Sequence, residues 1–209
     1  MKVLKAPRIK DNTPDEVERL HEILDGQERH LLEFLLWQNG GDEPTVSFSI
    51  AHNNHSVLLG FFVDEKEIRA TITKTNGPVW EDSCVEFFVA FDERGYYNFE
   101  FNYMGTVHCG FGKNVNQREL IPGQLLSKIR SHTAVAKIKD HFHWEMAMEI
   151  PVEVFNHHPL SSLAGITCRG NFCKCGDGLS EPHYLAWNNI ESATPNFHLP
   201  QFFGKIMFA

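Results

Sequence analysis

The sequence predicts an all-β protein: an antiparallel β-sandwich of the jelly-roll type with a short N-terminal helix. Many short segments alternate apolar and polar residues between polar turns, which is typical of antiparallel sheets with one buried face. The 17 Phe residues far outnumber the 4 Tyr and 4 Trp, and a Phe-rich interior suits strands better than helices. A chain of 209 residues suffices for one large domain. We therefore expect a single domain over 1–209, with 1–40 as an N-terminal extension whose helix packs on the sandwich.

The expected helix begins after a polar cap. Residues 12–16 supply capping side chains, a proline and acidic residues, which together favour a helix start. Val17, Leu20 and Leu24 then follow at helical spacing as far as Gly26.

Apolar runs, either alternating or continuous, predict the strands. The expected strands are 45–50, 57–63, 68–73, 84–91, 97–103, 142–150, 166–175 and 203–208. We expect long loops at 113–124 and 176–182.

The hairpin made by 84–91 and 97–103 places polar residues on one face. Matching its two apolar faces requires an odd-length loop of about three or five residues, because a one-residue slip turns a strand over. Glu86 then lies opposite either Glu100 or Asn102. In both registers these three side chains share the polar face of the sheet, away from the core.

Two tryptophans, Trp80 and Trp187, stand where strand-like patterns end, and both have polar neighbours. A sugar ring packs its C–H face on an indole, while its hydroxyls need donors and acceptors around the rim. Core packing is the alternative interpretation for each of them. Trp37 and Trp144 lie in apolar runs, so we expect both to stabilise the core.

Several stretches resemble the family 9 carbohydrate-binding modules, and they are spread over roughly 46–208. The stretches are Trp80 to Phe88, Tyr96 to Asn102 with Gly105-Thr106, Arg169 to Phe172, His183 to Trp187, Pro195 to His198, and Phe202 to Gly204. The resemblance implies a β-sandwich that binds the ends of glycan chains between two stacked tryptophans, often beside hydrolase domains. It implies carbohydrate binding without catalysis, in the service of polysaccharide breakdown.

The resemblance also implies roles for individual residues. Trp80 and Trp187 match the clamp, Glu86 matches a carboxylate that accepts sugar hydroxyls, and Asn102 matches an amide partner. Arg169 and Asn171 match a family motif, either as site residues or as a buried structural pair. The sequence departs from better-understood members at Glu100, where a basic residue would have been useful, and at Cys168, Cys173 and Cys175.

Composition and charge restrict the partners. A net charge of −8 disfavours nucleic acid, which requires clustered Lys and Arg. No apolar run reaches the ~20 residues of a membrane span. The expected partners are therefore oligosaccharide or polysaccharide ends, with no nucleic acid and no membrane, for a chain that is compatible with a monomer.

The N-terminus and the cysteines bear on compartment and cofactors. Residues 1–8 lack the apolar segment of a secretory signal, so we expect a cytoplasmic protein, or an exported one if a signal was removed. Five irregularly spaced cysteines disfavour a disulfide framework, and we expect all five to be reduced. We expect no cofactor, and the sequence neither indicates nor excludes a structural calcium ion.

Three other chemistries remain open. A glycoside hydrolase could use Glu86 with a second carboxylate, although no pattern indicates that one carboxyl is kept protonated. The candidates for that second carboxylate are Glu81, Asp82 and Glu100. Zinc could be held by Cys168, Cys173, Cys175 and His183, although small buried side chains on a strand explain the cysteines more simply. Haem could recruit Met104 and His108, but no attachment motif is present.

Overall fold

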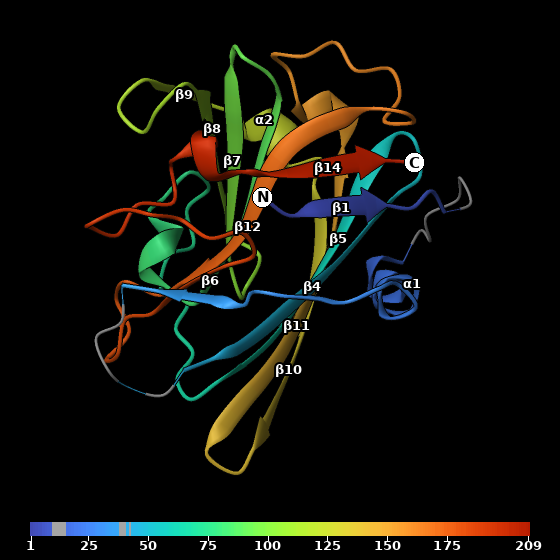
Figure 1. The fold of residues 1–209 in the computed structure, drawn as a ribbon. Coiled ribbons are helices and arrows are strands. Elements are labelled where there is room, and N and C mark those ends of the chain that lie inside the picture. The colour runs from blue at the N-terminus through green and yellow to red at the C-terminus, as the bar shows by residue number, and fades with distance from the viewer. Residues whose placement is uncertain (10–15, 38–40, 42) are drawn as a thin grey trace.

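The protein is a sandwich of two β-sheets in a computed structural model that describes residues 1–9, 16–37, 41 and 43–209 (Figure 1). The strands are β1 (Val3–Ala6), β2 (His30–Leu31), β3 (Phe34–Leu36), β4 (Thr45–His52), β5 (Ser56–Glu65), β6 (Cys84–Asp92), β7 (Gly95–Asn102), β8 (Val107–Gly112), β9 (Arg118–Leu120), β10 (Arg130–Ile138), β11 (His141–Pro151), β12 (Thr167–Cys175), β13 (Tyr184–Ala186) and β14 (Gly204–Phe208). The helical segments are η1 (Val17–Arg19), α1 (Leu20–Asp25), η2 (Val79–Glu81), α2 (Gly123–Leu126), η3 (Val152–Val154) and η4 (Pro200–Phe202).

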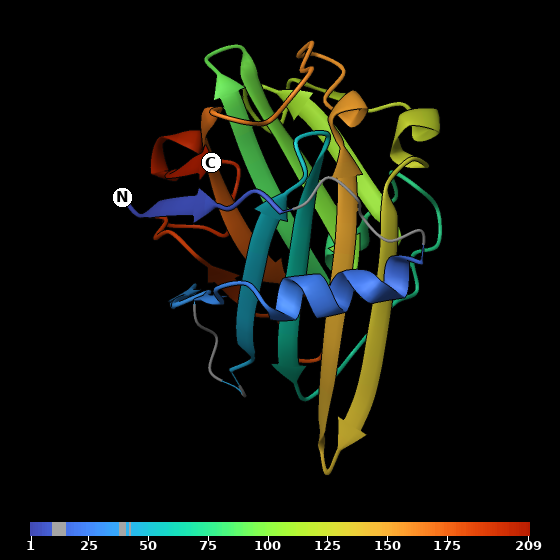
Figure 2. The same ribbon diagram turned by 90° about the vertical axis from the view of Figure 1, so that its right-hand side faces the viewer.

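Strand pairing confirms the expected fold class. In the described part of the chain, a nine-stranded sheet runs β1-β14-β12-β6-β7-β8-β9, with β13 paired to β12 and β3. A five-stranded sheet runs β10-β11-β5-β4-β2. All of these pairs are antiparallel except β1 with β14. In both views the β10–β11 hairpin extends beyond the rest of the sandwich (Figures 1 and 2).

Aromatic side chains fill the space between the sheets. Phe172 on β12 stacks on Phe87 of the neighbouring strand, with ring centroids 5.0 Å apart. It also stacks on Phe48 of the opposite sheet, with centroids 3.7 Å apart. Trp144 is fully buried and lies in the core, where its apolar run placed it. Stacked rings at these separations add to the stabilisation from buried area.

The helix covers the outer face of the five-stranded sheet. Leu20 and Leu24 are fully buried against Ala51 of β4, Leu58 of β5 and Ala147 of β11. Figure 2 shows α1 lying across these three strands. The expected helix is therefore present. Of its expected start at 12–16, only Glu16 lies within the described residues. No helix that the structure describes is long and apolar enough to span a membrane.

The N-terminal segment does more than the expected extension. Residues 3–6 form β1 and pair with β14, β2 joins β4, and β3 joins β13. The segment thus contributes strands to both sheets as well as the helix, because its short apolar stretches complete sheet edges that are otherwise unpaired.

Two expected elements differ from the structure. No strand forms over 68–73, because the backbone amides of Thr71 and Ile72 donate to the carboxylate of Asp82 instead of to a neighbouring strand. The expected loop 113–124 contains β9 and the start of α2. By contrast, 176–182 is a loop as expected.

The register of the central hairpin settles the alternative that the sequence left open. Glu86 pairs with Glu100, and Asn102 pairs with Cys84. The register shifts between Val89 and Asp92, so a β-bulge near the turn absorbs the extra residue that an odd spacing requires. The polar face of the hairpin is therefore the one expected, with two carboxylates side by side.

Candidate functional site

A cavity of about 500 Å³ lies on the outer face of the nine-stranded sheet. It falls within the range of small-molecule sites, about 300–1,000 Å³. Its lining consists of Trp37, Trp80, Glu86, Glu100, Val115, Arg118, Cys175, Asp177, Tyr184, Thr194, Pro195, Asn196, Phe197 and His198. Aromatic rings therefore form much of its wall, and charged groups lie on its floor.

Trp80 reaches the cavity from the short helical turn η2. The half-buried indole packs edge-on against His108, with ring centroids 5.4 Å apart and planes at 89°. Its carbonyl oxygen accepts from the backbone amide of Asp177, at 3.0 Å. The turn is thereby tied to the loop after β12, which lines the same cavity.

A buried carboxylate holds this turn in place. Asp82 is fully buried and accepts from the backbone amides of Thr71 (3.0 Å) and Ile72 (2.9 Å) and from Asn102 Nδ2 (2.9 Å). Burial would raise its pKa, but these hydrogen bonds lower it below the usual value. Asn102 also donates to the carbonyl of Ile72 at 2.8 Å, so its amide supports the turn behind Trp80 and does not line the cavity.

Trp37 forms a second aromatic wall. It follows β3, has a φ of 47°, and its indole N–H donates to the carbonyl of Ser192 at 2.7 Å. Its half-buried ring lies 5.6 Å from Phe197 and 5.7 Å from Tyr184. The expectation that Trp37 belongs to the core is therefore wrong in part, because one side of the ring packs while another lines the cavity.

The floor carries two carboxylates on neighbouring strands. Glu86 is 3% exposed, and its oxygens accept from Cys175 Sγ at 3.1 Å and from Asn98 Nδ2 at 3.2 Å. Glu100 is 2% exposed, and its Oε2 is buried without a hydrogen-bond partner. Burial raises the pKa of Glu86 to about 7. Burial, together with the nearby charge of Glu86, raises the pKa of Glu100 well above its usual value.

One arginine stands beside these carboxylates. Arg118 on β9 donates to Asn98 Oδ1 at 2.7 Å and to His198 Nδ1 at 3.3 Å. Burial, followed by the charge of Arg118, lowers the pKa of His198 to about 3. The imidazole is therefore neutral. Because arginine only donates, Nδ1 is the unprotonated nitrogen and the ring proton lies on Nε2.

A third carboxylate lies at the rim. Asp177 is exposed and hydrogen bonds the hydroxyl of Tyr184. Partial desolvation at the cavity rim raises the pKa of Asp177 above its usual value. Donors, acceptors and aromatic planes thus converge in one cavity, the combination that a ring with both C–H faces and hydroxyls requires.

The thiols beneath the cavity form a possible metal-ligand set. Cys84, Glu86 and Cys175 bring one ligand atom each within 4.8 Å of one another. Burial raises the pKa of Cys84 to about 12, and the hydrogen bond with Cys84 together with burial raises that of Cys175 well above its usual value. Metals bind thiolates, so this environment favours two protonated thiols, of which Cys175 donates to Glu86.

The other expected metal sets are not brought together. Cys168 belongs to the core between the sheets, whereas His183 accepts from Lys174 Nζ at 2.8 Å. Met104 is 67% exposed, whereas His108 is buried against Trp80. All five cysteines are free thiols.

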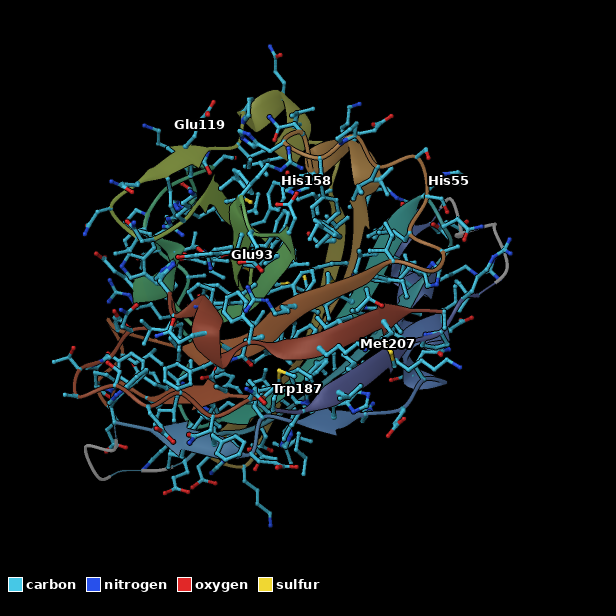
Figure 3. The ribbon with its side chains drawn as sticks, turned by 45° about the horizontal axis from the view of Figure 1, so that its top comes forward. His55, Glu93, Glu119, His158, Trp187 and Met207 are labelled. Atoms are coloured by element: carbon cyan, nitrogen blue, oxygen red, sulfur yellow. The ribbon has the colours of Figure 1, made fainter. Side chains whose placement is uncertain are left out.

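Trp187 corrects the expected clamp. Its side chain is 3% exposed and packs edge-on against Phe48 and Phe172 in the core. In Figure 3 it lies close to the ribbons of β1 and β14, and a Cβ at Gly204 of β14 would meet its ring at 2.5 Å. Trp187 therefore cannot share a sugar with Trp80, since its ring fills the space between the sheets.

Arg169 and Asn171 also lie outside the cavity. Asn171 is fully buried and bonds the backbone of Asn188 through both ends of its amide, at 2.9 and 3.0 Å. Arg169 has a partly exposed side chain that faces Glu93 at 3.4 Å. Of the expected site residues, the structure brings Trp80 and Glu86 into the cavity, and it gives Asn102 and Asn171 internal hydrogen bonds.

Sequence reasoning missed most of the cavity wall. The lining residues outside the expected site include Trp37, Arg118, Asp177, Tyr184, Asn196, Phe197 and His198. One signal was present. Side chains alternate along an extended strand, so Tyr184 of β13 and Trp187, the residue directly after β13, point to opposite faces. Only one of them could have faced a ligand.

Comparison with known proteins agrees with this architecture. The model of carbohydrate-binding family 9 matches residues 18–208. A protein from Bacteroides uniformis ATCC 8492, described as a candidate carbohydrate-binding protein, is 36% identical, with a TM-score of 0.93 over 100% of this chain and 99% of that one. No curated protein sequence matches the chain.

Two more distant structures share the fold. Both are family 9 carbohydrate-binding modules from Caldicellulosiruptor kristjanssonii. One, in complex with glucose, is 13% identical, with a TM-score of 0.62 over 100% of this chain and 96% of that one. The other, in complex with cellotriose, is 14% identical, with a TM-score of 0.61 over 99% and 93%.

Proposed function

The chain belongs to carbohydrate-binding family 9, and from that premise we propose that its cavity holds the end of a glycan chain between Trp37 and Trp80. The observation that supports this most is the pairing of two half-buried indoles with carboxylates in one cavity of about 500 Å³. Trp37 takes the place that the sequence resemblance gave to Trp187. Binding serves the breakdown of polysaccharides, without chemistry at the site.

The polar groups have complementary roles in this proposal. Glu86 and Glu100 accept hydrogen bonds from sugar hydroxyls, or donate one where a carboxyl is protonated. Arg118 and His198 stand beside them as donors. The aromatic planes supply affinity, and these groups fix which hydroxyls are tolerated.

Titration with cellotriose, the ligand of one distant relative, tests the proposal. Each indole should contribute on the order of 1–2 kcal/mol, so Trp37→Ala and Trp80→Ala should each weaken binding by roughly tenfold or more. Intrinsic fluorescence should respond to ligand in the wild type and lose part of that response in each variant.

Trp187→Phe is the matched control. It should lower the unfolding midpoint and leave the affinity of the folded protein unchanged. If no member of a glycan panel that includes cellotriose and xylotriose binds, the proposed function is wrong. A loss of affinity in Trp187→Phe with none in Trp37→Ala would restore the clamp that the sequence suggested.

One observation favours hydrolysis as a second candidate. Glu86 and Glu100 are directly paired across the hairpin, and retaining glycosidases hold two carboxyl groups about 5–5.5 Å apart. Such an enzyme needs one protonated and one ionised carboxyl, whereas burial raises the pKa of both here. Reducing ends released by wild-type protein, and abolished in Glu86→Gln, would establish catalysis. Their absence at pH 5 to 8 would leave binding alone.

A further inference from the structure

The floor of the cavity brings together more carboxyl groups than its cationic side chain pairs with. Among the described residues that line it, the carboxyl groups are Glu86, Glu100 and Asp177, and the side chain with a full positive charge is Arg118. His198 is neutral because burial lowers its pKa to about 3. Carboxyl groups therefore outnumber the cation in the lining. Two of them, Glu86 and Glu100, are buried, and a cation bound beside them would favour their ionised form.

Arg118 does not pair with the acids. Its guanidinium donates to Asn98 and His198, and no ion pair to Glu86 or Glu100 occurs in the described part of the chain. Both oxygens of Glu86 are already occupied, by Cys175 and Asn98. Each oxygen of Glu86 thus has one donor and can accept another, whereas Oε2 of Glu100 has none.

Glu100 is the unsatisfied group. Its side chain is 2% exposed and lines the cavity, while Oε2 is buried and accepts no hydrogen bond. A buried polar atom without a partner is destabilising, and a second carboxyl group on the adjacent strand makes ionisation of Glu100 still less favourable unless a cation binds. His108 on β8, the cross-strand neighbour of Glu100, does not meet this need. Neither of its buried ring nitrogens makes a hydrogen bond, and its lowered pKa leaves the ring without a positive charge.

We propose that the cavity selects sugars that carry a free amine, with the ammonium group seated between Glu100 and Glu86. This inference rests on the proposed carbohydrate-binding function and names its ligand class. An ammonium supplies three donors and one positive charge, which matches an orphan acceptor flanked by a second acid. Charge-assisted hydrogen bonds of this kind are roughly twice as strong as neutral ones, and burial strengthens them further.

Three disaccharides with the same β-1,4-linked glucose skeleton isolate the amine. Cellobiose carries a hydroxyl at C2 of each ring. The disaccharide of glucosamine carries an amine there, and the disaccharide of N-acetylglucosamine carries an acetamide. By isothermal titration at pH 7, the amine should bind the wild type at least tenfold more tightly than either of the others. Trp80→Ala should weaken all three, since the indole packs on the skeleton they share.

Glu100→Gln removes the charge and keeps the shape. It should reduce the ratio of amine to hydroxyl affinity by at least tenfold. Glu93→Gln is the matched control, because Glu93 lies on the β6–β7 turn (Figure 3), has a 91% exposed side chain and does not line the cavity. It should leave the ratio unchanged.

The outcomes separate this inference from the proposed function. If cellobiose binds as tightly as the amine, the cavity is a carbohydrate site and the amine preference is wrong. A preference that survives in Glu100→Gln also contradicts the inference, since long-range attraction to an acidic protein would then explain it. Equal binding of 1,4-diaminobutane would show a cation site without sugar selectivity. If the Gln variant does not fold, the comparison of the three disaccharides on wild-type protein still decides the inference.

Discussion

The position of Glu86 on its strand determines both its burial and its pKa. It lies mid-strand on β6, where alternation directs it away from the Phe87 side of the sheet. The loops that cover this outer face leave it 3% exposed. A carboxyl that water cannot reach is easier to keep protonated than ionised, which is why burial raises its pKa to about 7.

This burial gives a prediction for stability against pH. The pKa of Glu86 rises on folding from 4.5 to about 7, so the folded state binds the proton more tightly than the unfolded state does. Its contribution to stability is fully present below about pH 4.5 and is lost as the pH rises through 7. The free energy of unfolding of Glu86→Gln, measured with urea from pH 5 to 8, should therefore gain on that of the wild type as pH rises.

The difference between the two pH profiles is the quantity to compare, because buried histidines titrate in the same window. Glu93→Gln, which replaces an exposed carboxylate, should give a profile parallel to that of the wild type. Parallel profiles for Glu86→Gln as well would show that Glu86 is ionised in the folded protein.

At the scale of elements, the phase of β13 decides which aromatic residues meet a ligand. Leu185 and Trp187 belong to the core between the sheets, while Tyr184 and Ala186 pack on the cavity side. To bring Trp187 to the cavity side, β13 would have to shift by one residue in its pairing with β12. That shift would also move Leu185 out of the core. The strand therefore fixes Trp187 in the core despite the polar residues after it.

The packing of α1 gives a second prediction. Leu24 is fully buried on the outer face of the five-stranded sheet, and a Cβ at Gly60 would meet it at 3.3 Å. Leu24→Ala should lower the free energy of unfolding by about 2–5 kcal/mol, the usual range for a buried leucine. Glu22→Ala, on the exposed side of the same helix, should change it by less than about 0.5 kcal/mol. Equal losses from both would mean that helix propensity, and not packing, makes α1 stable.

At the scale of the molecule, one buried ion pair connects the two sheets. Lys174 on β12 and Glu65 on β5 are 0% and 2% exposed, with Nζ and Oε2 2.8 Å apart. Trp144 donates to Glu65 Oε1 at 2.7 Å. Burial alone would raise the pKa of Glu65, but Lys174 and the hydrogen bonds from His183 and Trp144 lower it to about 2. Its contribution to stability is present above pH 4.5 and is lost as pH falls through 2.

Breaking this pair should cost more than removing it. Lys174→Met leaves a buried carboxylate without its cation and should destabilise the protein by about 3–5 kcal/mol at pH 7. Adding Glu65→Gln should recover much of that loss, since the amide oxygen can still accept from Trp144. Urea unfolding of the single and double variants measures both values, with Lys113→Met on an exposed loop as the control. No recovery in the double variant would contradict the stranded-charge explanation.

The sequence by itself determined the features that follow from local periodicity. Alternation predicted the sandwich, the central hairpin and the shared polar face of Glu86 and Glu100, because side-chain direction along a strand follows from backbone geometry. The resemblance to family 9 modules singled out Trp80, which lines the cavity. These features need no knowledge of how distant segments meet.

Only the tertiary structure decided which residues complete the cavity. Trp37 directly follows β3 and Arg118 lies on β9, and these two strands are at opposite ends of the pairing in the nine-stranded sheet. His198 comes from the segment between β13 and β14. Their meeting depends on the order of strands and the course of loops over the outer face, which no local pattern encodes. The position of Trp187 has the same explanation. Its polar neighbours in the sequence suggested a ligand site, but the packing of the two sheets places its ring in the core against Phe48.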